Sequence, residues 1–545
     1  MYVLGINGDL GRNAHDPSAF LYKDGKLVCA GEEERYNRIR FSAAMLPENA
    51  INFCLQKENI TIKDISYVAF PQETWGELFQ ERIENFFEYK FSHVPEIRYY
   101  NHHDAHAAST FYNSGFENAL VITADGSGDG ISTAIYIALK GKLKRIEKKS
   151  SFPDSFGLFY SLITQYLGFI KNSDEYKVMG MAAYGNPVYD LSSFLSLRDN
   201  TFSLNEAYLN GNSKNIKFPM HVTKQEKLFS EKMENLFGCL PRNCKQPFQE
   251  EHFNIAASAQ HHLENVMKQI LLYYIHKYDV HNVCLAGGVF MNCLMNGKLA
   301  KLKEIESLYV PPVCDDAGTA MGAAILCVID NGLHIERINN AYFGDEESNE
   351  LLKWKLDKYN IRYTDCKEGI YECVAQKLSQ NDIIGWFQGK MEIGARALGN
   401  RSILANPKDI EMKDKVNQIK RREYFQPFGS SVLEEYKNEY FNIPANCSDE
   451  FMTVTYDATE KAEKEISAVI NKDKTSRIQS VSRRANERYA NLLHVFSLME
   501  NCPVLLNTSL NRKGEPIARC MEDALAILFS TNLNGLAVGD MFIEK

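Results

Sequence analysis

The chain has 545 residues, a formal net charge of -9 and a 45% share of hydrophobic residues. This length exceeds what one ordinary core holds, so we expect at least two domains. The acidic balance excludes a general affinity for nucleic acid or membrane surfaces, and no run of about 18 apolar residues predicts a membrane span. Thirteen cysteines without C-x-x-C pairs are typical of reduced thiols. With no visible secretion signal, the expected location is the cytoplasm.

The first thirty residues predict a strand, a loop and a hairpin. An apolar run covers residues 2–7, and a second run, A-F-L-Y, leads to a D-G turn at 24–25, after which residues 26–30 form a third strand. This start is typical of actin-like ATPase domains. His15 lies in the first loop, where a solvated side chain is the simplest interpretation. The run E-E-E-R-Y-N-R at 32–38 is expected to be a solvated charged segment.

A candidate metal site follows. His102 and His106 are four residues apart in an Ala-rich stretch, so a helix would place both imidazoles on one face. The apolar run 119–124 predicts a buried strand that ends in Asp125 and a Gly-rich turn. Two imidazoles and one carboxylate suit a divalent cation. The alternative, ordinary helix histidines and an aspartate that serves only the turn, stays open.

The remainder of the first half predicts an α/β architecture. The segment 254–278 has a helical apolar stripe, and the strand and turn V-C-L-A-G-G-V-F-M-N after it repeat the earlier V-I-T-A-D-G-S-G pattern. Two such turns suit the duplicated halves of an actin-like fold with a nucleotide between them. Asp316, in the turn C-D-D-A-G, is a metal candidate, although helix capping explains it more simply. Residues 190–250 are polar and indicate an excursion, which we place over an acceptor pocket.

The second half concentrates positive charge. Residues 340–365 are polar and suggest a boundary, a helix is expected at 370–378 and a strand at 383–387. Basic residues separated by glycines can converge on phosphates. A solvated basic face is the alternative. The basic residues are Lys390, Arg396, Arg401, Lys420, Arg421 and Arg422.

Eight ordered stretches together resemble the O-carbamoyltransferases of the tobramycin and nodulation-factor type, across nearly the whole chain. They are N-A-H-D-P-S-A, H-H-D-A-H, D-G-S-G-D-G, E-Y-K-V-M-G-M-A-A-Y-G, G-G-V-F-M-N, D-D-A-G-T-A-M-G-A-A, R-A-L-G-N-R-S-I-L and L-L-N-T-S-L-N-R-K-G-E-P-I. Three departures concern the second half. Ala395 replaces a usual proline, Gln426 replaces a usual arginine, and Ser476 replaces the alanine of a T-A-R stretch.

The resemblance implies an actin-like (ASKHA) metalloprotein domain over residues 1–338 and a YrdC-like α/β domain over residues 339–545. In the first domain it implies a divalent metal, iron by preference, on His102, His106, Asp125 and Asp316, which favours ligation over capping for Asp316. His15 matches a loop histidine that acts as the base. The implied nucleotide contacts are Gly128, Lys177, Gly287, Gly288 and Asn292. The implied substrate contacts of the second domain are Lys390, Arg396, Arg401, Lys420, Arg422, Arg477, Ser509 and Asn511.

The implied reaction joins carbamoyl phosphate and ATP, with Mg²⁺, into carbamoyl-adenylate and transfers the carbamoyl group to a hydroxyl. The expected acceptor is a small molecule such as a sugar, an antibiotic or another natural product, and a homodimer is compatible with this interpretation. A tRNA-modifying threonylcarbamoyl enzyme is a second hypothesis, which the charge of -9 disfavours. A non-catalytic actin-like nucleotide-binding regulator is a third.

Overall fold

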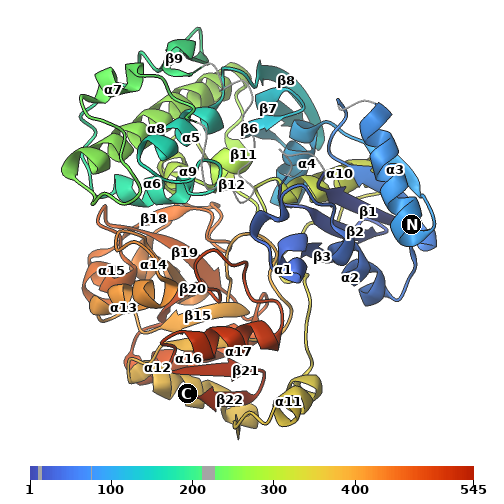
Figure 1. Ribbon diagram of the computed structural model, residues 1–545, viewed down its shortest axis with the longest axis vertical. Coiled ribbons are helices and arrows are strands. Elements are labelled where there is room, and N and C mark those ends of the chain that lie inside the picture. The colour runs from blue at the N-terminus through green and yellow to red at the C-terminus, as the bar shows by residue number, and fades with distance from the viewer. Residues whose placement is uncertain (10–14, 75–76, 211–226) are drawn as a thin grey trace. The chain divides into compact units, whose positions relative to one another are not determined.

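The computed structural model describes residues 1–9, 15–74, 77–210 and 227–545 (Figure 1). They form two compact units. Unit 1 consists of Met1–Val28, Ser42–Arg337 and Ala445–Cys447, and unit 2 of Cys29–Phe41, Ile338–Pro444 and Ser448–Lys545. This division differs from a single cut between residues 338 and 339, because a short N-terminal segment belongs to unit 2 and three residues near 446 belong to unit 1.

Unit 1 contains two five-stranded sheets of the same topology. The first sheet has the order β3-β2-β1-β4-β5, with β1 antiparallel to β2 and parallel to β4. The second has the order β12-β11-β6-β7-β8, with β6 antiparallel to β7 and parallel to β11. In each sheet the first strand is central, its hairpin partners lie on one side and two parallel strands on the other. This repetition agrees with the expected duplicated, actin-like fold.

The strands of the two sheets have the following bounds. The first sheet contains β1 (Tyr2–Asn7), β2 (Ser18–Lys23), β3 (Lys26–Glu32), β4 (Ile65–Phe70) and β5 (Glu96–Tyr99). The second sheet contains β6 (Ala119–Gly128), β7 (Ile131–Leu139), β8 (Lys142–Ser150), β11 (Asn282–Ala286) and β12 (Ser307–Tyr309).

Two central helices join the sheets of unit 1. Helix α10 (Ala317–Asp330) packs on β1 and β2, helix α4 (His102–Ser114) packs on β6 and β11, and the helices pack on each other (Figure 1). Their approach depends on Gly322, where a Cβ atom would lie 1.8 Å from the carbonyl oxygen of Ala105. Small residues of the D-D-A-G-T-A-M-G-A-A motif therefore set the distance between the two helices.

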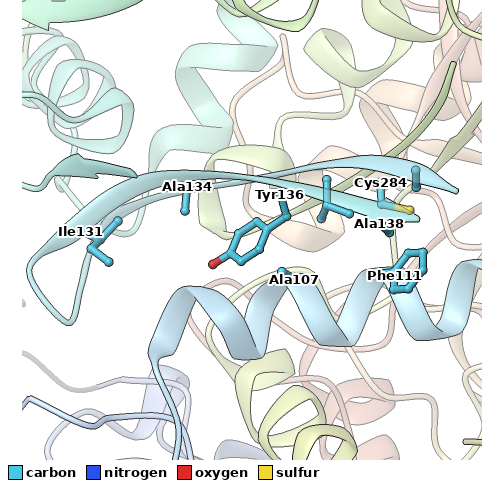
Figure 2. Packing of buried hydrophobic residues seen from close by; sticks show 9 residues of the cluster. Ala107, Phe111, Ile131, Ala134, Tyr136, Ala138 and Cys284 are labelled. Atoms are coloured by element: carbon cyan, nitrogen blue, oxygen red, sulfur yellow. The ribbon is translucent and has the colours of Figure 1, made fainter. Parts of the chain in front are cut away.

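Helix α4 is held against the second sheet by an apolar cluster (Figure 2). Ala107 and Phe111 of the helix face Ala134 and Tyr136 of β7, and all four side chains are buried. The Tyr136 hydroxyl donates to Asp104 Oδ1 over 2.8 Å, so its polar end is also satisfied. Truncation of Phe111 to alanine would cost about 3–5 kcal/mol of unfolding free energy.

The other helices of unit 1 lie around these sheets. They are α2 (Glu48–Glu58), α3 (Glu77–Phe91), α5 (Phe156–Tyr166), α6 (Glu175–Ala182), α7 (Lys232–Phe237), α8 (Glu250–Tyr278) and α9 (Cys293–Ala300). The helix expected at 254–278 is α8, which begins four residues earlier. The 190–250 excursion contains the hairpin of β9 (Leu195–Arg198) and β10 (Thr201–Leu204) and helix α7, while residues 211–226 lie outside the described part.

Unit 2 is built on one ten-stranded mixed sheet with the order β13-β22-β21-β14-β15-β20-β16-β19-β18-β17. Its strands are β13 (Thr364–Asp365), β14 (Ile384–Phe387), β15 (Arg401–Ala405), β16 (Gly429–Leu433), β17 (Phe441–Asn442), β18 (Thr455–Ala458), β19 (Thr475–Val481), β20 (Val504–Ser509), β21 (Gly535–Val538) and β22 (Met541–Glu544). Its longer helices are α11 (Asn349–Lys358), α12 (Ile370–Ser379), α13 (Glu411–Lys420), α16 (Glu487–Glu500) and α17 (Met521–Ser530). Within the described ranges, no helix is both long and apolar enough to cross a membrane.

The charged run 32–38 is not solvated, contrary to our expectation. Glu32, Glu33 and Arg35 are 8%, 3% and 1% exposed, and the run forms the short helix α1 (Glu33–Asn37) within unit 2. Arg35 Nη2 lies 2.8 Å from Glu32 Oε2, so the buried charges are paired. Local charge patterning missed this burial because residues far along the chain create it.

Candidate metal centre and anion site

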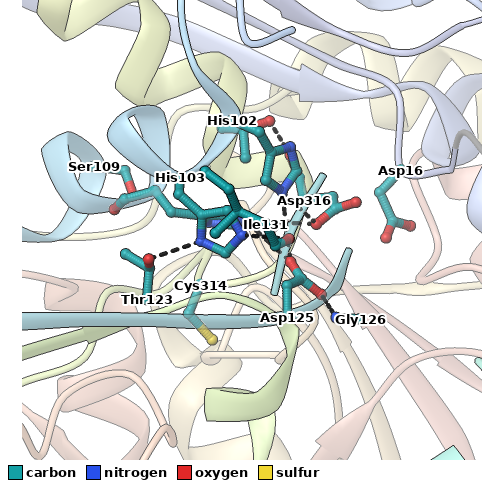
Figure 3. Close-up of polar contacts among 12 residues, drawn as sticks. Asp16, His102, His103, Ser109, Thr123, Asp125, Gly126, Ile131, Cys314 and Asp316 are labelled. Atoms are coloured by element: carbon teal, nitrogen blue, oxygen red, sulfur yellow. Dashed lines mark hydrogen bonds and ion pairs between the residues drawn. The ribbon is translucent and has the colours of Figure 1, made fainter. Parts of the chain in front are cut away.

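Four side chains converge at one place in unit 1. His102 and His106 are four residues apart on α4, and their Nε2 atoms lie near two carboxylates. Figure 3 shows His102 beside Asp125 and Asp316. The His106 Nε2 atom is 3.2 Å from Asp125 Oδ2 and 3.5 Å from Asp316 Oδ1. The His102 Nε2 atom is 3.6 Å from the same two oxygens. One potential ligand atom from each residue lies within 4.8 Å of the others.

The two carboxylates reach this place from element ends. Asp125 follows the buried run of β6, where the pairing of β6 with β7 is interrupted between Ala124 and Gly128. Asp316 precedes α10, but its side chain makes no capping hydrogen bond. Helix capping therefore does not account for an aspartate at position 316. Helix α4, in contrast, is capped by Asn101, whose side chain accepts a hydrogen bond from the His103 backbone N–H.

The cluster fits a divalent cation. The His102 Nε2 atom is buried and has no hydrogen-bond partner among the described residues, which is costly unless something else occupies that position. Two imidazoles and two carboxylates are a donor set that iron and related divalent ions accept. Burial opposes the charge on Asp125, but the adjacent imidazoles of His102 and His106 hold its pKa well below the usual range.

His103, between the two candidate ligands, has a different environment. Its Nδ1 atom lies 2.8 Å from Thr123 Oγ1 and its Nε2 atom 3.0 Å from the Ile131 carbonyl oxygen (Figure 3). A carbonyl only accepts, so Nε2 carries the hydrogen and Nδ1 accepts from the threonine hydroxyl. Burial lowers the pKa of His103 well below the usual value, which agrees with a neutral ring. His103 is thus a satisfied core histidine.

His15 lies at the edge of the cluster. Its Nε2 atom is 3.5 Å from Asp316 Oδ2, and its Nδ1 atom donates to Asp16 Oδ2 over 2.8 Å. Burial lowers the pKa of His15, but the carboxylates of Asp316 and Asp16 outweigh it and raise the pKa to about 10. A cation at the cluster would offset this negative charge and lower the pKa again. Our sequence analysis gave Asp16 no role, although it fixes the ring orientation.

Gly128 and Ser155 contact residues of the metal cluster. Gly128 packs on His102, because a Cβ atom there would lie 2.0 Å from the ring Cδ2 atom. Ser155 Oγ donates to the carbonyl oxygens of Asp125 (3.1 Å) and Gly126 (2.8 Å) and also caps α5. Gly128 was expected to contact nucleotide, and its visible role is to make room for an imidazole. Ser155 lies outside every motif that we had assigned to the site.

The other residues expected to contact nucleotide have internal partners. Lys177 Nζ lies 3.0 Å from Asp174 Oδ2. Asn292 caps α9, with its Oδ1 accepting from Met295 N–H, and its Nδ2 donates to Gln260 Oε1. Gly287 and Gly288 form the turn after β11, where a Cβ atom on Gly288 would lie 3.0 Å from Asp125 Oδ1. Nucleotide contact by this group stays a prediction.

In unit 2 the structure brings together Lys420, Ser509 and Asn511. The Lys420 Nζ atom, at the end of α13, donates to the carbonyl oxygens of Ser509 (2.5 Å) and Asn511 (2.8 Å) and to the Asn511 side chain. Lys420 is 1% exposed, and its visible partners among the described residues are all neutral oxygens. Burial and the neighbouring Arg422 lower the pKa of Lys420 well below its usual value.

The remaining basic residues divide into two groups. Arg401 is fully buried, and its guanidinium donates to the carbonyl oxygens of Gln388 (2.5 Å) and Asn400 (3.0 Å), so its contacts are with the protein backbone. Arg396, Arg422 and Arg477 are partly exposed, and Lys390 is exposed. The visible contacts of Arg401 are therefore structural, and substrate contact by the basic set stays a prediction.

Strand register relates these positions to each other. Arg477 of β19 pairs with Gly429 of β16, which pairs with Asn507 of β20, and Ser402 of β15 pairs with Ser509. Because β20 is antiparallel to β15 and β16, its carboxyl end meets the amino ends of those strands. Arg401, Arg477 and Ser509, which come from separate motifs, therefore lie at one end of the sheet.

Comparisons with known proteins agree with this architecture. A family model described as the carbamoyltransferase N-terminus matches residues 68–325, and one described as the carbamoyltransferase C-terminus matches residues 375–545. Nodulation protein NolNO of Sinorhizobium fredii is 33% identical, covering all of this chain and 83% of that protein. Nodulation protein NolO of Bradyrhizobium diazoefficiens is 35% identical, covering 82% of this chain and 79% of that protein.

An uncharacterised Synechocystis protein is 32% identical, with all of this chain and 97% of that protein covered. The likeness therefore extends over both units rather than over one of them. With both family models matched and relatives of this similarity along most of its length, the chain belongs to the carbamoyltransferase family.

Proposed function

We propose that this carbamoyltransferase forms carbamoyl-adenylate in unit 2 and transfers its carbamoyl group to the hydroxyl of a small molecule in unit 1. The observation that carries the proposal is the buried Lys420, whose visible partners in the described part of the chain are neutral oxygens. An anionic ligand beside this amine would favour its protonated form, so the group suits a phosphate-bearing ligand. The partly exposed arginines at the same sheet end extend the positive charge.

In the first half-reaction, carbamoyl phosphate, ATP and water give carbamoyl-adenylate, phosphate and pyrophosphate. Water first cleaves carbamoyl phosphate to carbamate and phosphate. A carbamate oxygen then attacks the α-phosphorus of ATP, and the bond to the pyrophosphate oxygen breaks. Lys420, Arg396, Arg422 and Arg477 would balance the charge of both anionic reactants and of the leaving group. Positively charged groups that are already in place need no reorganisation when the leaving group takes its charge.

In the second half-reaction, an acceptor hydroxyl attacks the carbamoyl carbonyl carbon and AMP leaves. His15 takes the hydroxyl proton at Nε2, while Asp16 holds the ring through Nδ1. His102, His106, Asp125 and Asp316 would hold a divalent cation, which would supply Lewis-acid charge beside the phosphate group of the adenylate. The pKa of His15 falls from its metal-free value when that positive charge is present, which favours a base near neutral pH.

Pyrophosphate release tests the first half-reaction. Wild-type protein with ATP and carbamoyl phosphate should release pyrophosphate, and Arg396→Ala should lower the rate by about 10²–10³-fold because one charge contact to the reactants is lost. His15→Asn is the matched control, since His15 lies in the other unit. A wild-type protein that releases no pyrophosphate would exclude the adenylate route.

Transfer tests the choice of acceptor. Product formation from carbamoyl-adenylate and a panel of hydroxyl compounds should require a small-molecule alcohol and not tRNA. Carbamoylated tRNA as the preferred product would favour the threonylcarbamoyl hypothesis. A protein that binds nucleotide without consuming it would favour the regulator hypothesis.

A further inference from the structure

The N-terminal segment of unit 2, Cys29–Phe41, carries buried charges that neither proposed half-reaction uses. We call it the inserted segment. Its backbone turns sharply, with left-handed φ angles of 61° at Arg38 and 64° at Phe41. The Phe41 N–H donates to Glu34 Oε2 over 2.8 Å and closes the segment on itself. Strained backbone of this kind persists when surrounding contacts determine it.

The inserted segment binds both polar groups of Gly394. The Gly394 N–H donates to Glu32 Oε1 over 2.5 Å, and Arg35 Nη2 donates to the Gly394 carbonyl oxygen over 2.8 Å. The Glu32 and Arg35 side chains also pair with each other at 2.8 Å. Gly394 precedes Arg396 by two residues, so a buried ion pair fixes the chain just before a proposed substrate contact.

The same loop is fixed after Arg396 by a different carboxylate. Glu392 Oε1 accepts from the Leu398 N–H over 2.7 Å and from the Asn400 N–H over 3.3 Å. Gln479 Nε2 donates to the Leu398 carbonyl oxygen over 2.7 Å. The loop is thus held on both sides of Arg396, and the inserted segment holds its first half at Gly394 through charged side chains.

Arg38 makes equivalent contacts with the second proposed substrate loop. Its Nη1 atom donates to the Ile517 carbonyl oxygen over 2.7 Å and its Nη2 atom to the Pro516 carbonyl oxygen over 2.9 Å. This loop leaves the sheet through Ser509, and within it Asn511 Nδ2 donates to the Glu515 carbonyl oxygen over 2.5 Å. Arg38 therefore holds residues 516–517 at the end of this loop. The start of the same loop, at Ser509 and Asn511, contacts Lys420.

We propose that the inserted segment positions the adenylate-forming site, with Glu32 and Arg35 holding the Arg396 loop and Arg38 holding the 511–517 loop. This inference rests on the proposed function of unit 2. The three side chains touch backbone and other side chains of the protein, so they are positioning residues. A displacement of about 1 Å at a reacting group lowers rates by about 10²-fold.

Two variants separate the two loops. In Glu32→Gln one terminal atom becomes an N–H donor, so the side chain cannot accept from both Gly394 and Arg35. Arg38→Ala removes both carbonyl contacts and the 3.3 Å ion pair of Arg38 Nε with Asp523 from a partly exposed arginine, and Arg38→Lys restores one donor group. Lys408→Ala is the matched control, because Lys408 also donates to a carbonyl and a carboxylate oxygen, both of Glu500, but lies beyond the opposite end of β15.

Two measurements on the 545-residue chain test whether the inserted segment positions these loops. By hydrogen exchange, Glu32→Gln should accelerate exchange in residues 392–401 and Arg38→Ala in residues 511–518, each without the other. In pyrophosphate release, measured well below the unfolding transition of each variant, both variants should lower kcat about 10–100-fold. Arg38→Lys should recover part of the rate, and Lys408→Ala should resemble wild type.

The outcomes distinguish this inference from the proposed function. Wild-type pyrophosphate release together with normal rates in Glu32→Gln and Arg38→Ala overturns the positioning role. Unchanged exchange in both loops overturns it as well, whatever the rates are. If wild-type protein releases no pyrophosphate, the proposed function fails, and the exchange pattern alone decides whether the inserted segment holds the two loops.

Discussion

At the scale of single residues, the helix α4 separates two kinds of histidine. His106 faces the two carboxylates, while His103 is satisfied by Thr123 and Ile131. We expect His106→Ala to lose the bound divalent metal and carbamoyl transfer together, because it removes one of four ligands. His103→Gln, on the same helix, should lower stability but keep the metal. Elemental analysis of both purified variants checks this, and equal metal content in His106→Ala and wild type would contradict the site.

The metal affinity of the same cluster should depend on pH. Burial lowers the pKa of His106, but hydrogen bonds to Asp125 and Asp316 raise it to about 9 in the metal-free protein. A cation binds the neutral imidazole, so the proton must leave. Because the ring is protonated below that pKa, affinity should rise as pH rises and level off above about 9, by up to about tenfold per pH unit for each proton released.

Competition against a chromophoric chelator at a series of pH values measures this dependence, after correction for the chelator's own protonation. Release of protons on metal addition to weakly buffered protein is an independent check. An affinity that is constant from neutral pH to pH 9 would show that the imidazoles are already neutral in the metal-free protein.

At the scale of elements, the contact between α4 and α10 sets the ligand geometry, since each helix supplies part of the cluster. Gly322→Ala would place a Cβ atom 1.8 Å from the Ala105 carbonyl oxygen. Alanine normally stabilises a helix by about 1 kcal/mol relative to glycine, whereas overpacking costs about 1–3 kcal/mol or more. We therefore expect lower unfolding free energy and weaker metal binding.

Gly369→Ala is the control for this substitution, because nothing lies within 4 Å of a Cβ atom there and its φ is -79°. Chemical denaturation and metal titration of both variants test the argument. A Gly322→Ala protein that is more stable than wild type would mean that helix propensity dominates and that the helices are not in limiting contact.

The elements also show what can be predicted from sequence. The His102–His106 spacing and the apolar run just before Asp125 are local patterns, so the candidate metal cluster was predictable except for Asp316, whose place depends on the packing of α10. Burial is a property of the whole fold, and for that reason the charged run 32–38 was wrongly expected to be solvated. The burial of Arg401 and its hydrogen bonds to backbone carbonyl oxygens likewise could not be predicted from the sequence.

At the scale of the whole molecule, every described residue of the metal cluster belongs to unit 1, and the Lys420 group belongs to unit 2. The proposed half-reactions should therefore be separable. Lys420→Met keeps a long side chain and removes the charge, so pyrophosphate release should fall by about 10²-fold or more. Carbamoyl-adenylate supplied from outside should restore transfer by this variant to the wild-type rate.

His15→Asn should show the opposite pattern. It keeps a hydrogen-bonding side chain but no base near neutral pH, so pyrophosphate release should be normal while transfer falls by about 10²–10⁴-fold. If His15 only binds the acceptor, the variant would instead raise the KM for acceptor with nearly unchanged kcat. Transfer kinetics over a range of acceptor concentrations, with carbamoyl-adenylate supplied, distinguish the two roles. If added carbamoyl-adenylate does not restore transfer by Lys420→Met, unit 2 also takes part in transfer.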